Sequence, residues 1–277
     1  MDELRFHTAG IPLSTKPQKN MLNALDRIRA LGLDGMELEY TRGILLDYPK
    51  VREIGAKARA LGLTLTAHAP YYINLFADEK KKVDRSVEQI MDTARLLDAA
   101  GGYSVVFHAA YYMGKQPHKV YPEVLRQVEA IAALAKKEAL RVRIRPELMG
   151  KTTQFGTLEE VVNLAEDAGG NILPCIDFAH LHARTGRYNT YEEFASALEF
   201  IAKRLGDDAL RDMHMHFSGI RYSAKGEQKH LIVRESDFRY REFLKCLKDY
   251  DVCGVLVVES PNVEGDALWL KKIFGTM

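Results

Sequence analysis

Short β-type segments alternate with longer helical segments along the whole chain. Each of eight segments rich in β-branched and other apolar residues is followed by a stretch with helical periodicity. The expected strands are 3–8, 34–39, 63–68, 103–108, 142–147, 172–177, 211–217 and 253–259. The expected helices are 18–31, 49–61, 79–100, 121–139, 157–168, 191–205, 237–249 and 264–274. Eight such units predict an α/β fold, a single (β/α)8 TIM barrel in one domain over residues 1–277, rather than an open doubly wound sheet.

Two of the expected helices begin with the signature of a capping box. Thr157 is followed three residues later by Glu160, and Thr190 is followed in the same way by Glu193. In this motif the hydroxyl and the carboxylate each accept a hydrogen bond from a free backbone N–H of the first turn. The pattern predicts sharp helix starts at these two positions.

Composition places the chain among ordinary globular proteins. Its 277 residues are 47% hydrophobic and 28% charged, with a formal net charge of +1. The balance excludes a strong overall field toward a polyanion, although local basic patches still act on nucleic acid. Three cysteines without a C-x-x-C pair, and an amino terminus without a signal-peptide pattern, favour a cytoplasmic protein with no membrane span. We expect a monomer.

Nearly every expected strand ends in a residue that can bind a metal or transfer a proton. The strand ends carry His68, His108, Glu147, Asp177, His214 with His216, and Glu259. A barrel brings the carboxyl ends of its strands to one mouth, so these distant residues would meet there. Imidazole and carboxylate are the ligands of zinc and manganese, and burying several carboxylates together without a cation is costly. The sequence therefore predicts a polynuclear metal centre at the barrel mouth.

Each of these residues, taken singly, also has a plain structural explanation. A histidine that ends an apolar strand is more often a hydrogen-bonded core residue than a ligand, and Asp177 is equally suited to capping the next turn. His180 follows three residues after Asp177, so both can reach the same rim. His214 and His216 point the same way along a strand, and we expect only His216 to be a ligand, with His214 in the layer below.

Two arginines complicate the barrel interior. If Glu147 faces inward, simple alternation also turns Arg143 and Arg145 inward, where a charge needs a partner. Either Pro146 interrupts the alternation, or the arginines pair with Glu37 or Glu39 of the second strand.

The segment 218–230 follows the seventh strand and is predicted to be a loop. It carries Arg221, Lys225, Lys229 and His230. It is either a solvated charged loop or a lid that brings a further ligand and several cations to a phosphate group.

The segment after the third strand places Tyr71 and Tyr72 close to His68. Exposed paired aromatic rings beside a ligand are suited to stacking on a base or to wedging a duplex. Packing against neighbouring loops is the alternative for both rings.

These motifs, in this order, resemble endonuclease IV, the class II apurinic/apyrimidinic endonuclease family of the xylose isomerase-like barrels. The chain looks closest to archaeal-type members, and the similarity of motif order covers nearly all of it. The motifs are H-A-P-Y-Y-I-N-L (68–75), the histidine at 108, P-E (146–147), C-I-D-F-A-H (175–180), H-F-S-G (216–219), His230 and V-V-E-S-P-N (257–262).

The resemblance implies three zinc sites, with manganese as the alternative ion. It assigns the first to His68, His108 and Glu147, the second to Glu147, Asp177, His216 and Glu259, and the third to His180 and His230. The family has an aspartate two positions before its last histidine, where this chain has Gln228. An amide is a poor zinc ligand, so we expect the adjacent Glu227 to take its place through a shifted loop. The third site therefore depends on that shift.

The resemblance also implies a reaction and a partner. The expected reaction is cleavage of duplex DNA on the 5′ side of an abasic site by zinc-activated hydroxide, which leaves a 3′-hydroxyl. Glu147 and Glu259 would be the catalytic carboxylates. Contacts to DNA are expected from Tyr71, Tyr72, Lys151, Arg221, Lys225 and Lys229.

Two other functions fit parts of the pattern. A metal-dependent sugar isomerase or epimerase of the same superfamily would use Glu147, Asp177, His216 and Glu259 alone. A non-catalytic protein that binds abasic DNA is the third alternative, because Gln228 departs from the family pattern.

Overall fold

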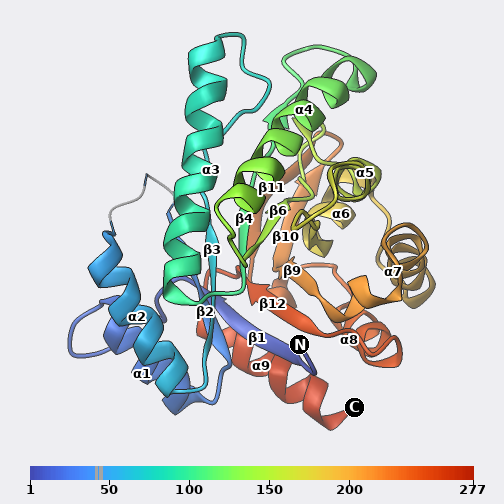
Figure 1. The fold of residues 1–277 in the computed structure, drawn as a ribbon. Helices are drawn as coiled ribbons and strands as arrows, with labels where there is room; N and C mark the ends of the chain where they lie inside the picture. Colours follow the sequence, from blue (N-terminus) through green and yellow to red (C-terminus); the bar gives the residue numbers. More distant parts are fainter. Residues whose placement is uncertain (41–42, 44–45) are drawn as a thin grey trace.

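Eight parallel strands form a barrel in the computed structural model, which describes residues 1–40, 43 and 46–277 (Figure 1). The strands are β1 (Leu4–Ala9), β2 (Gly35–Glu39), β3 (Thr64–His68), β4 (Ser104–Phe107), β6 (Arg143–Pro146), β8 (Cys175–Asp177), β9 (Met213–Phe217) and β12 (Gly254–Val258). Their order is β6-β4-β3-β2-β1-β12-β9-β8. Parallel bridges from Ile144 to Ile172 and from Glu147 to Cys175 join the two outer strands. These bridges close the ring, so the predicted TIM barrel is confirmed.

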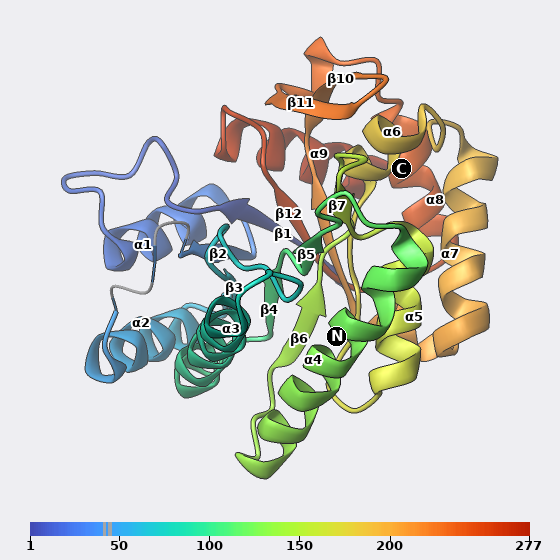
Figure 2. The same ribbon diagram turned by 90° about the horizontal axis from the view of Figure 1, so that it is seen from above.

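Helices surround the strands when the barrel is seen from above (Figure 2). They are α1 (Met21–Leu31), α2 (Tyr48–Ala60), α3 (Lys80–Ala100), α4 (Pro117–Lys137), α5 (Leu158–Ala168), α6 (Phe178–Thr185), α7 (Tyr191–Leu205), α8 (Tyr240–Asp249) and α9 (Glu264–Thr276), with short 3-10 turns at Asp207–Arg211 and Val233–Glu235. The helix expected from 121 begins earlier, at Pro117, and α6 was not predicted. Among the described residues, no helix has both the length and the apolar character that crossing a bilayer requires.

Two antiparallel strand pairs stand at the rim. β5 (Ala110–Tyr111) pairs with β7 (Gln154–Phe155), and β10 (Gly219–Ser223) pairs with β11 (Gly226–Leu231). The prediction of an irregular loop over 218–230 is therefore wrong. The backbone of this segment is satisfied by a hairpin ladder, which fixes the direction of its side chains more firmly than a loop would.

One of the two predicted capping boxes is complete. The Thr157 hydroxyl accepts from the Glu160 amide at 3.1 Å, and the Glu160 carboxylate accepts from the Thr157 amide at 2.9 Å. At α7 the Thr190 hydroxyl accepts from the Glu193 amide, but the Glu193 carboxylate accepts from Asn189 at 3.0 Å. Caps of this kind stabilise a helix by about 1 kcal/mol.

The foot of the barrel, formed by the amino-terminal ends of its strands, holds the two arginines of β6. Arg145 is 1% exposed and donates to the Asp212 carboxylate at 2.7 Å, and Arg143 donates to the other Asp212 oxygen at 2.9 Å. Pairing with Glu37 or Glu39 is therefore wrong. Both arginines reach toward the foot, whereas those glutamates approach the mouth, and Asp212, just before β9, is the nearer carboxylate.

Candidate metal centre

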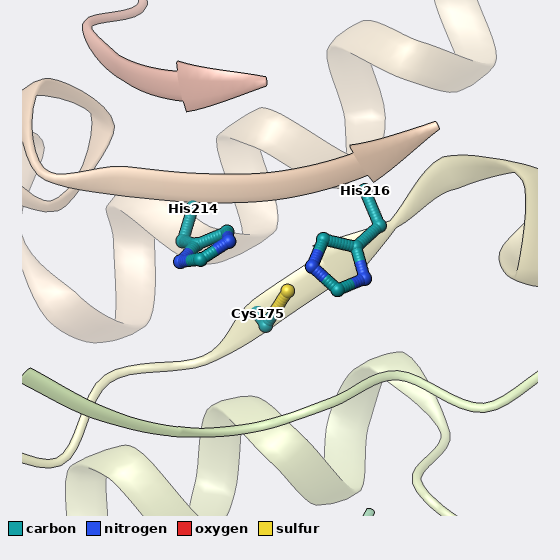
Figure 3. Close-up of side chains that lie close together, drawn as sticks. All are labelled: Cys175, His214 and His216. Carbon is teal, nitrogen blue, oxygen red and sulfur yellow. The ribbon is translucent and has the colours of Figure 1, made fainter. Parts of the chain in front are cut away.

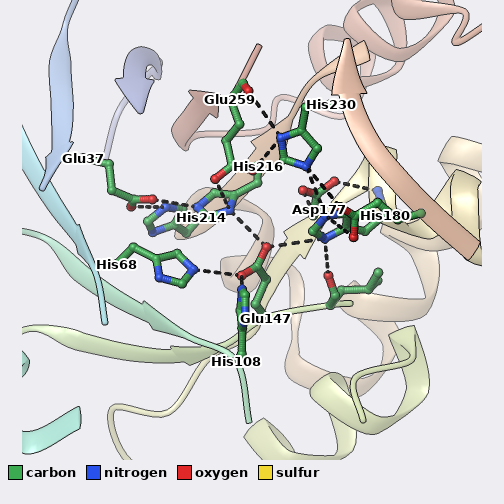
Figure 4. A network of polar contacts seen from close by, with 12 residues as sticks. Glu37, His68, His108, Glu147, Asp177, His180, His214, His216, His230 and Glu259 are labelled. Atoms are coloured by element: carbon green, nitrogen blue, oxygen red, sulfur yellow. Dashed lines mark hydrogen bonds and ion pairs between the residues drawn. The ribbon is translucent and has the colours of Figure 1, made fainter. Parts of the chain in front are cut away.

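The barrel brings the predicted ligands together although they are spread over most of the chain (Figure 4). The carboxyl ends of β3, β4, β6, β8, β9 and β12 supply most of them, as the alternation of strands and helices requires, and α6 and β11 supply His180, Glu227 and His230. They form three groups, of which the first two share Glu147, and in each group one possible ligand atom per residue lies within 4.8 Å of all the others. The groups are His68 with His108 and Glu147, then Glu147 with Asp177, His216 and Glu259, and then His180 with Glu227 and His230.

The first group surrounds one oxygen of Glu147. The Nε2 atoms of His68 and His108 lie 3.1 and 3.0 Å from Oε2 of this carboxylate. The Nδ1 atom of His68 contacts the backbone oxygen of Ala69 at 2.7 Å, which fixes the ring. Tyr71 stacks on His108 with the ring centroids 5.5 Å apart and forms one wall of the group.

The second group surrounds the other oxygen of Glu147. His216 Nδ1 lies 3.2 Å from Glu147 Oε1 and 3.4 Å from Glu259 Oε1. Asp177 Oδ1 accepts from the backbone amide of His180 at 2.7 Å and so caps α6. Its second oxygen is buried and, among the described residues, has no hydrogen-bond partner. Asp177 therefore fits both explanations, with one oxygen for the helix cap and one for a ligand.

The third group owes its geometry to a β-bulge. Arg221 pairs with Lys229 and Tyr222 pairs with Glu227, so Gln228 is an extra residue in β11. Residues three apart in a regular strand point to opposite faces, but the extra residue shifts the alternation. Glu227 and His230 therefore face the same side. The shift expected from the sequence is present as a bulge rather than as a loop.

Glu227 and His230 meet His180 inside the rim. His180 Nε2 lies 3.5 Å from Glu227 Oε2 and 3.5 Å from His230 Nε2. A side chain at Gly150 would collide with this group, because a Cβ atom there would lie 2.7 Å from Cβ of Glu227 and 2.9 Å from Cδ2 of His180. The absence of a side chain at Gly150 therefore makes room for the third group.

Charge at the mouth is balanced between carboxylates and imidazoles. Burial disfavours the charged form of Glu147, but the neighbouring His216 and His108 outweigh it and hold the pKa of Glu147 well below its usual range. Burial also lowers the pKa of His68 and His180, but Glu147 acting on His68, and Asp177 with Glu147 acting on His180, raise each pKa to about 9. The pKa of Asp177 is raised, first by burial. The raised pKa values favour protons on His68 and His180, which supply positive charge to this carboxylate cluster.

The residues present fit divalent ions. Two ligand atoms about 2.0–2.1 Å from one tetrahedral ion lie roughly 3.3 Å from each other. The contacts in the first two groups span 3.0–3.4 Å, and Asp177 offers a buried oxygen that makes no hydrogen bond among the described residues and lies 3.3 Å from His180 Nδ1. Nitrogen and carboxylate oxygen together suit zinc or manganese. The mouth therefore has the composition and spacing of divalent metal sites.

Comparison with known proteins places the chain in a family. The sequence profile of the xylose isomerase-like TIM barrel family matches residues 25–273. The chain belongs to this family. It is 41% identical to uncharacterized protein MJ0133 of Methanocaldococcus jannaschii over 99% of this chain and 98% of that protein. It is 27% identical to the probable endonuclease 4 of Oceanobacillus iheyensis, over 56% of this chain and 52% of that relative.

Solved structures of other xylose isomerase-like barrels share the fold. A D-tagatose 3-epimerase-like protein superposes with a TM-score of 0.74 and 19% identity over 97% of this chain and 96% of its own. Endonuclease IV from Thermus thermophilus superposes with a TM-score of 0.69 and 22% identity over 97% of this chain and 98% of its own. At these identities the likeness establishes the barrel and leaves the reaction open.

Below the candidate ligand groups lies a further polar layer of the xylose isomerase-like barrel. Cys175 and His214 meet His216 of the second group there, and all three side chains are fully buried and close enough to share an ion (Figure 3). Burial raises the pKa of the Cys175 thiol to about 12 and lowers the pKa of His214 to about 4. A neutral thiol and a neutral imidazole suit a packed hydrogen-bonding layer. His214 thus lies where the sequence analysis expected it.

A pocket of about 330 Å³ opens above the three groups. Tyr71 and Lys151 line it, so two of the residues predicted to contact DNA stand at the site. Tyr72 is also exposed, but its hydroxyl accepts from Gln89 at 2.7 Å and it lines a neighbouring depression. The predicted cations of the hairpin lie on its exposed surface, outside the pocket lining; they are Arg221, Lys225 and Lys229.

Several site residues were missed from the sequence. Tyr111, Met149 and Gln154 line the pocket from the β5–β7 pair and its neighbours, and no motif marks them. The sequence suggests Glu37 and Glu39 only as partners of arginines, yet each has a carboxylate oxygen within 4.8 Å of one in Glu259. Alternation along β2, which turns both side chains inward, was the available signal.

Proposed function

We propose that this protein is a metal-dependent endonuclease that cuts duplex DNA on the 5′ side of abasic sites and leaves a 3′-hydroxyl. One observation carries the proposal. Two further ligand groups flank the four-residue group of Glu147, Asp177, His216 and Glu259. A phosphoryl-transfer site needs several cations around one phosphorus, for the nucleophile and for the leaving oxygen. The partial similarity to probable endonuclease 4 supports the same reaction.

The residues divide the work by position. Divalent ions in this site would supply Lewis acidity and would make water nucleophilic at neutral pH. Glu147 uses one oxygen toward each of two groups and so sets the distance between them. Glu259, with a side chain 15% exposed, faces the pocket and orients the attacking water. Lys151 is placed to hold a non-bridging phosphate oxygen.

Selectivity for an abasic nucleotide follows from the shape of the mouth. A nucleotide without a base has lost stacking and pairing, so extruding it from the duplex costs less than extruding an intact one. The pocket of about 330 Å³ suits one sugar with its phosphate rather than a nucleotide with its base. Tyr71 and Tyr72 are 47% and 50% exposed, and we assign them to the gap that extrusion leaves in the duplex.

The decisive assay uses a synthetic duplex with one abasic analogue and a label on either end. We expect a single nick on the 5′ side, a 3′ end that a polymerase extends, loss of activity on prolonged chelation and recovery with zinc. Glu259→Gln should lower turnover at least about a hundred-fold while the protein stays folded. Glu129→Gln, the same change on the exposed face of α4, is the matched control. Unchanged turnover in Glu259→Gln would remove this residue from the mechanism.

A sugar isomerase or epimerase is the second candidate. The four-residue group of Glu147, Asp177, His216 and Glu259 by itself suits one ion and proton transfer next to a carbonyl. Such an enzyme would bind one manganese ion per chain and would not require His68, His108 or His230. Metal analysis combined with His108→Ala therefore separates the two reactions. A non-catalytic lesion-binding protein is the remaining outcome, and it would bind abasic DNA without nicking in added zinc.

A further inference from the structure

Glu37 is a fully buried carboxylate that the proposed reaction does not use. It lies on β2, and its two oxygens contact histidines of β9 across the barrel interior (Figure 4). Strands β1 and β12 separate β2 from β9 in the sheet order, so this is a contact through the interior rather than along the sheet. Oε1 lies 3.0 Å from Nε2 of His216, and Oε2 lies 3.1 Å from Nε2 of His214. The ring N–H directions are not ideal for hydrogen bonds, so the contacts are chiefly electrostatic.

The two histidines differ in what their other nitrogen meets. Nδ1 of His214 contacts the Ser104 hydroxyl at 2.6 Å, deep in the barrel. Nδ1 of His216 faces the second ligand group, 3.2 Å from Glu147 and 3.4 Å from Glu259. Only His216 therefore links Glu37 to the metal-binding mouth.

An imidazole that binds a cation through Nδ1 must carry its proton on Nε2. A carboxylate beside Nε2 favours that tautomer, fixes the ring direction and makes the other nitrogen a stronger ligand. A neutral acceptor would do so less well, and a donor at this position would favour the wrong tautomer. Glu37 meets this requirement at His216, and its other oxygen lies beside Nε2 of His214.

We propose that Glu37 is a positioning residue of the metal centre, which holds His216 with its proton on Nε2 and its Nδ1 lone pair directed at the second ligand group. The inference rests on the metal-binding part of the proposed function and is independent of the reaction type. It also explains why a carboxylate is buried in the layer below the ligands. The pairing across the barrel fixes the positions of both histidines of β9.

The test compares Glu37→Gln, which keeps the size of the side chain, with Glu37→Ala and with Ser104→Ala. Ser104→Ala removes the other contact of His214 and leaves His216 untouched, so it controls for loosening of the layer. Cobalt titration followed by absorption gives the affinity, and long-range ¹H–¹⁵N spectra of the zinc-loaded protein give the histidine tautomers. Circular dichroism checks that each variant is folded.

We expect Glu37→Ala to weaken the tightest cobalt binding about ten- to a hundred-fold. Glu37→Gln should have a smaller effect, and Ser104→Ala should change the affinity less than about two-fold. The His216 ring should show a protonated Nε2 in the wild type and a mixture of tautomers in Glu37→Ala. If Glu37→Ala folds less well, the tautomer and affinity of Glu37→Gln decide the result.

The two ways of failing are distinct. Wild-type protein that binds cobalt, with affinity and His216 tautomer unchanged in both Glu37 variants, would overturn the role of Glu37 and leave the metal centre intact. Wild-type protein that binds no divalent ion would overturn the metal centre and the role of Glu37 together.

Discussion

Strand β6 and the residue that follows it, Glu147, place a charge at each end of the barrel, and the two charges are neutralised in different ways. At the foot, the guanidinium of Arg145 donates to the carboxylate and backbone oxygen of Asp212 and to the backbone oxygen of Pro174. At the mouth, Glu147 is surrounded by the imidazoles of His68, His108 and His216, and the pKa is raised for His68 and His216 but lowered by burial for His108. The foot is a permanent ion pair made by the protein alone. The mouth is a set of nitrogen and oxygen atoms whose lone pairs can bind protons or exchangeable metal ions.

The comparison separates two uses of buried charge. A buried charge costs free energy unless it is paired, and a fixed partner such as Asp212 meets that cost in the folded protein. Clustered carboxylates and histidines instead leave part of the compensation to protons or metal ions, which vary with pH and with supply. The foot should therefore respond to mutation in stability, and the mouth should respond in metal content and activity.

The largest expected effect is at the mouth. Glu147→Gln removes the carboxylate shared by the first two groups and leaves an amide, which is a poor ligand. We expect metal content to fall by at least one ion per chain and nicking activity to fall at least about a hundred-fold. Substituting a residue that only contacts a metal ligand already lowers metal affinity or activity about 10–100-fold, and Glu147 is itself a proposed ligand. Metal analysis by mass spectrometry and the duplex assay measure both. Full metal content in the variant would contradict the assignment of Glu147.

The corresponding change at the foot should act on stability alone. Asp212→Ala leaves Arg145 without its carboxylate partner, and breaking a fully buried pair costs about 3–5 kcal/mol. Because the Asp212 side chain is 22% exposed, we expect a smaller loss, about 2–3 kcal/mol, in the free energy of unfolding. Urea unfolding measures it. If the Asp212→Ala variant were folded but had lost bound metal, the foot and the mouth would not be independent in their effects on stability and metal content.

The bulge in β11 offers a sharper test within the mouth. Deleting Gln228 restores regular alternation, which turns either Glu227 or His230 away from His180. We expect loss of one bound ion per chain and a fall in activity of about ten-fold or more. Gln228→Ala keeps the bulge and is the control. Three ions in the deletion variant would show that the third group does not need Glu227 and His230 on one face.

The two ends should also differ in their dependence on pH. His68 and His180 have folded pKa values raised from 6.5 to about 9, so the stability they contribute is fully present below pH 6.5 and is lost as the pH rises through about 9. The pKa of Asp212 is lowered from 3.8, so its contribution is constant across that window. Metal-free protein should therefore lose stability between pH 6.5 and 9, and metal-loaded protein should not. Unfolding midpoints measured with and without chelator test this prediction. If the midpoint of the metal-free protein did not change between pH 6.5 and 9, the exchange of protons for metal ions at the mouth would be contradicted.

The smallest effect is expected at the pocket rim. Lys151→Ala should weaken binding to abasic duplex a few-fold and reduce the slope of log affinity against log salt by about 0.9, the value for one phosphate contact. Arg221→Ala should change this slope less, because Arg221 lies on the exposed hairpin and outside the pocket lining, whereas Lys151 is part of that lining. Fluorescence anisotropy at several salt concentrations measures both. Equal slopes for wild type and Lys151→Ala would remove Lys151 from the contact.

Most of the barrel was predictable because its signals are local. The strand ranges follow from apolar runs and the helix starts from caps such as Thr157, and closure then brings His68, Glu147 and Glu259 to one mouth. Two features depend on how segments pair, one between residues far apart in the sequence and one within a hairpin. Arg145 finds Asp212 across the foot, and Gln228 bulges because β10 and β11 pair with one residue in excess. Neither register nor pairing partner can be read from a single segment.

The short helix α6 illustrates the same limit at the site. The sequence allows Asp177 to be either a turn cap or a ligand, and spacing alone presents the two uses as alternatives. In the structure one oxygen caps α6 and the other is left for the mouth. The division between the two oxygens depends on the direction of the helix, which no residue spacing specifies.

The most direct measurement is a zinc-edge anomalous difference map from crystals grown with zinc. Three peaks at the mouth are expected, two of them on either side of the Glu147 carboxylate and the third between His180, Glu227 and His230. A single peak among Glu147, Asp177, His216 and Glu259, or an empty mouth with zinc elsewhere, would contradict a multi-ion centre.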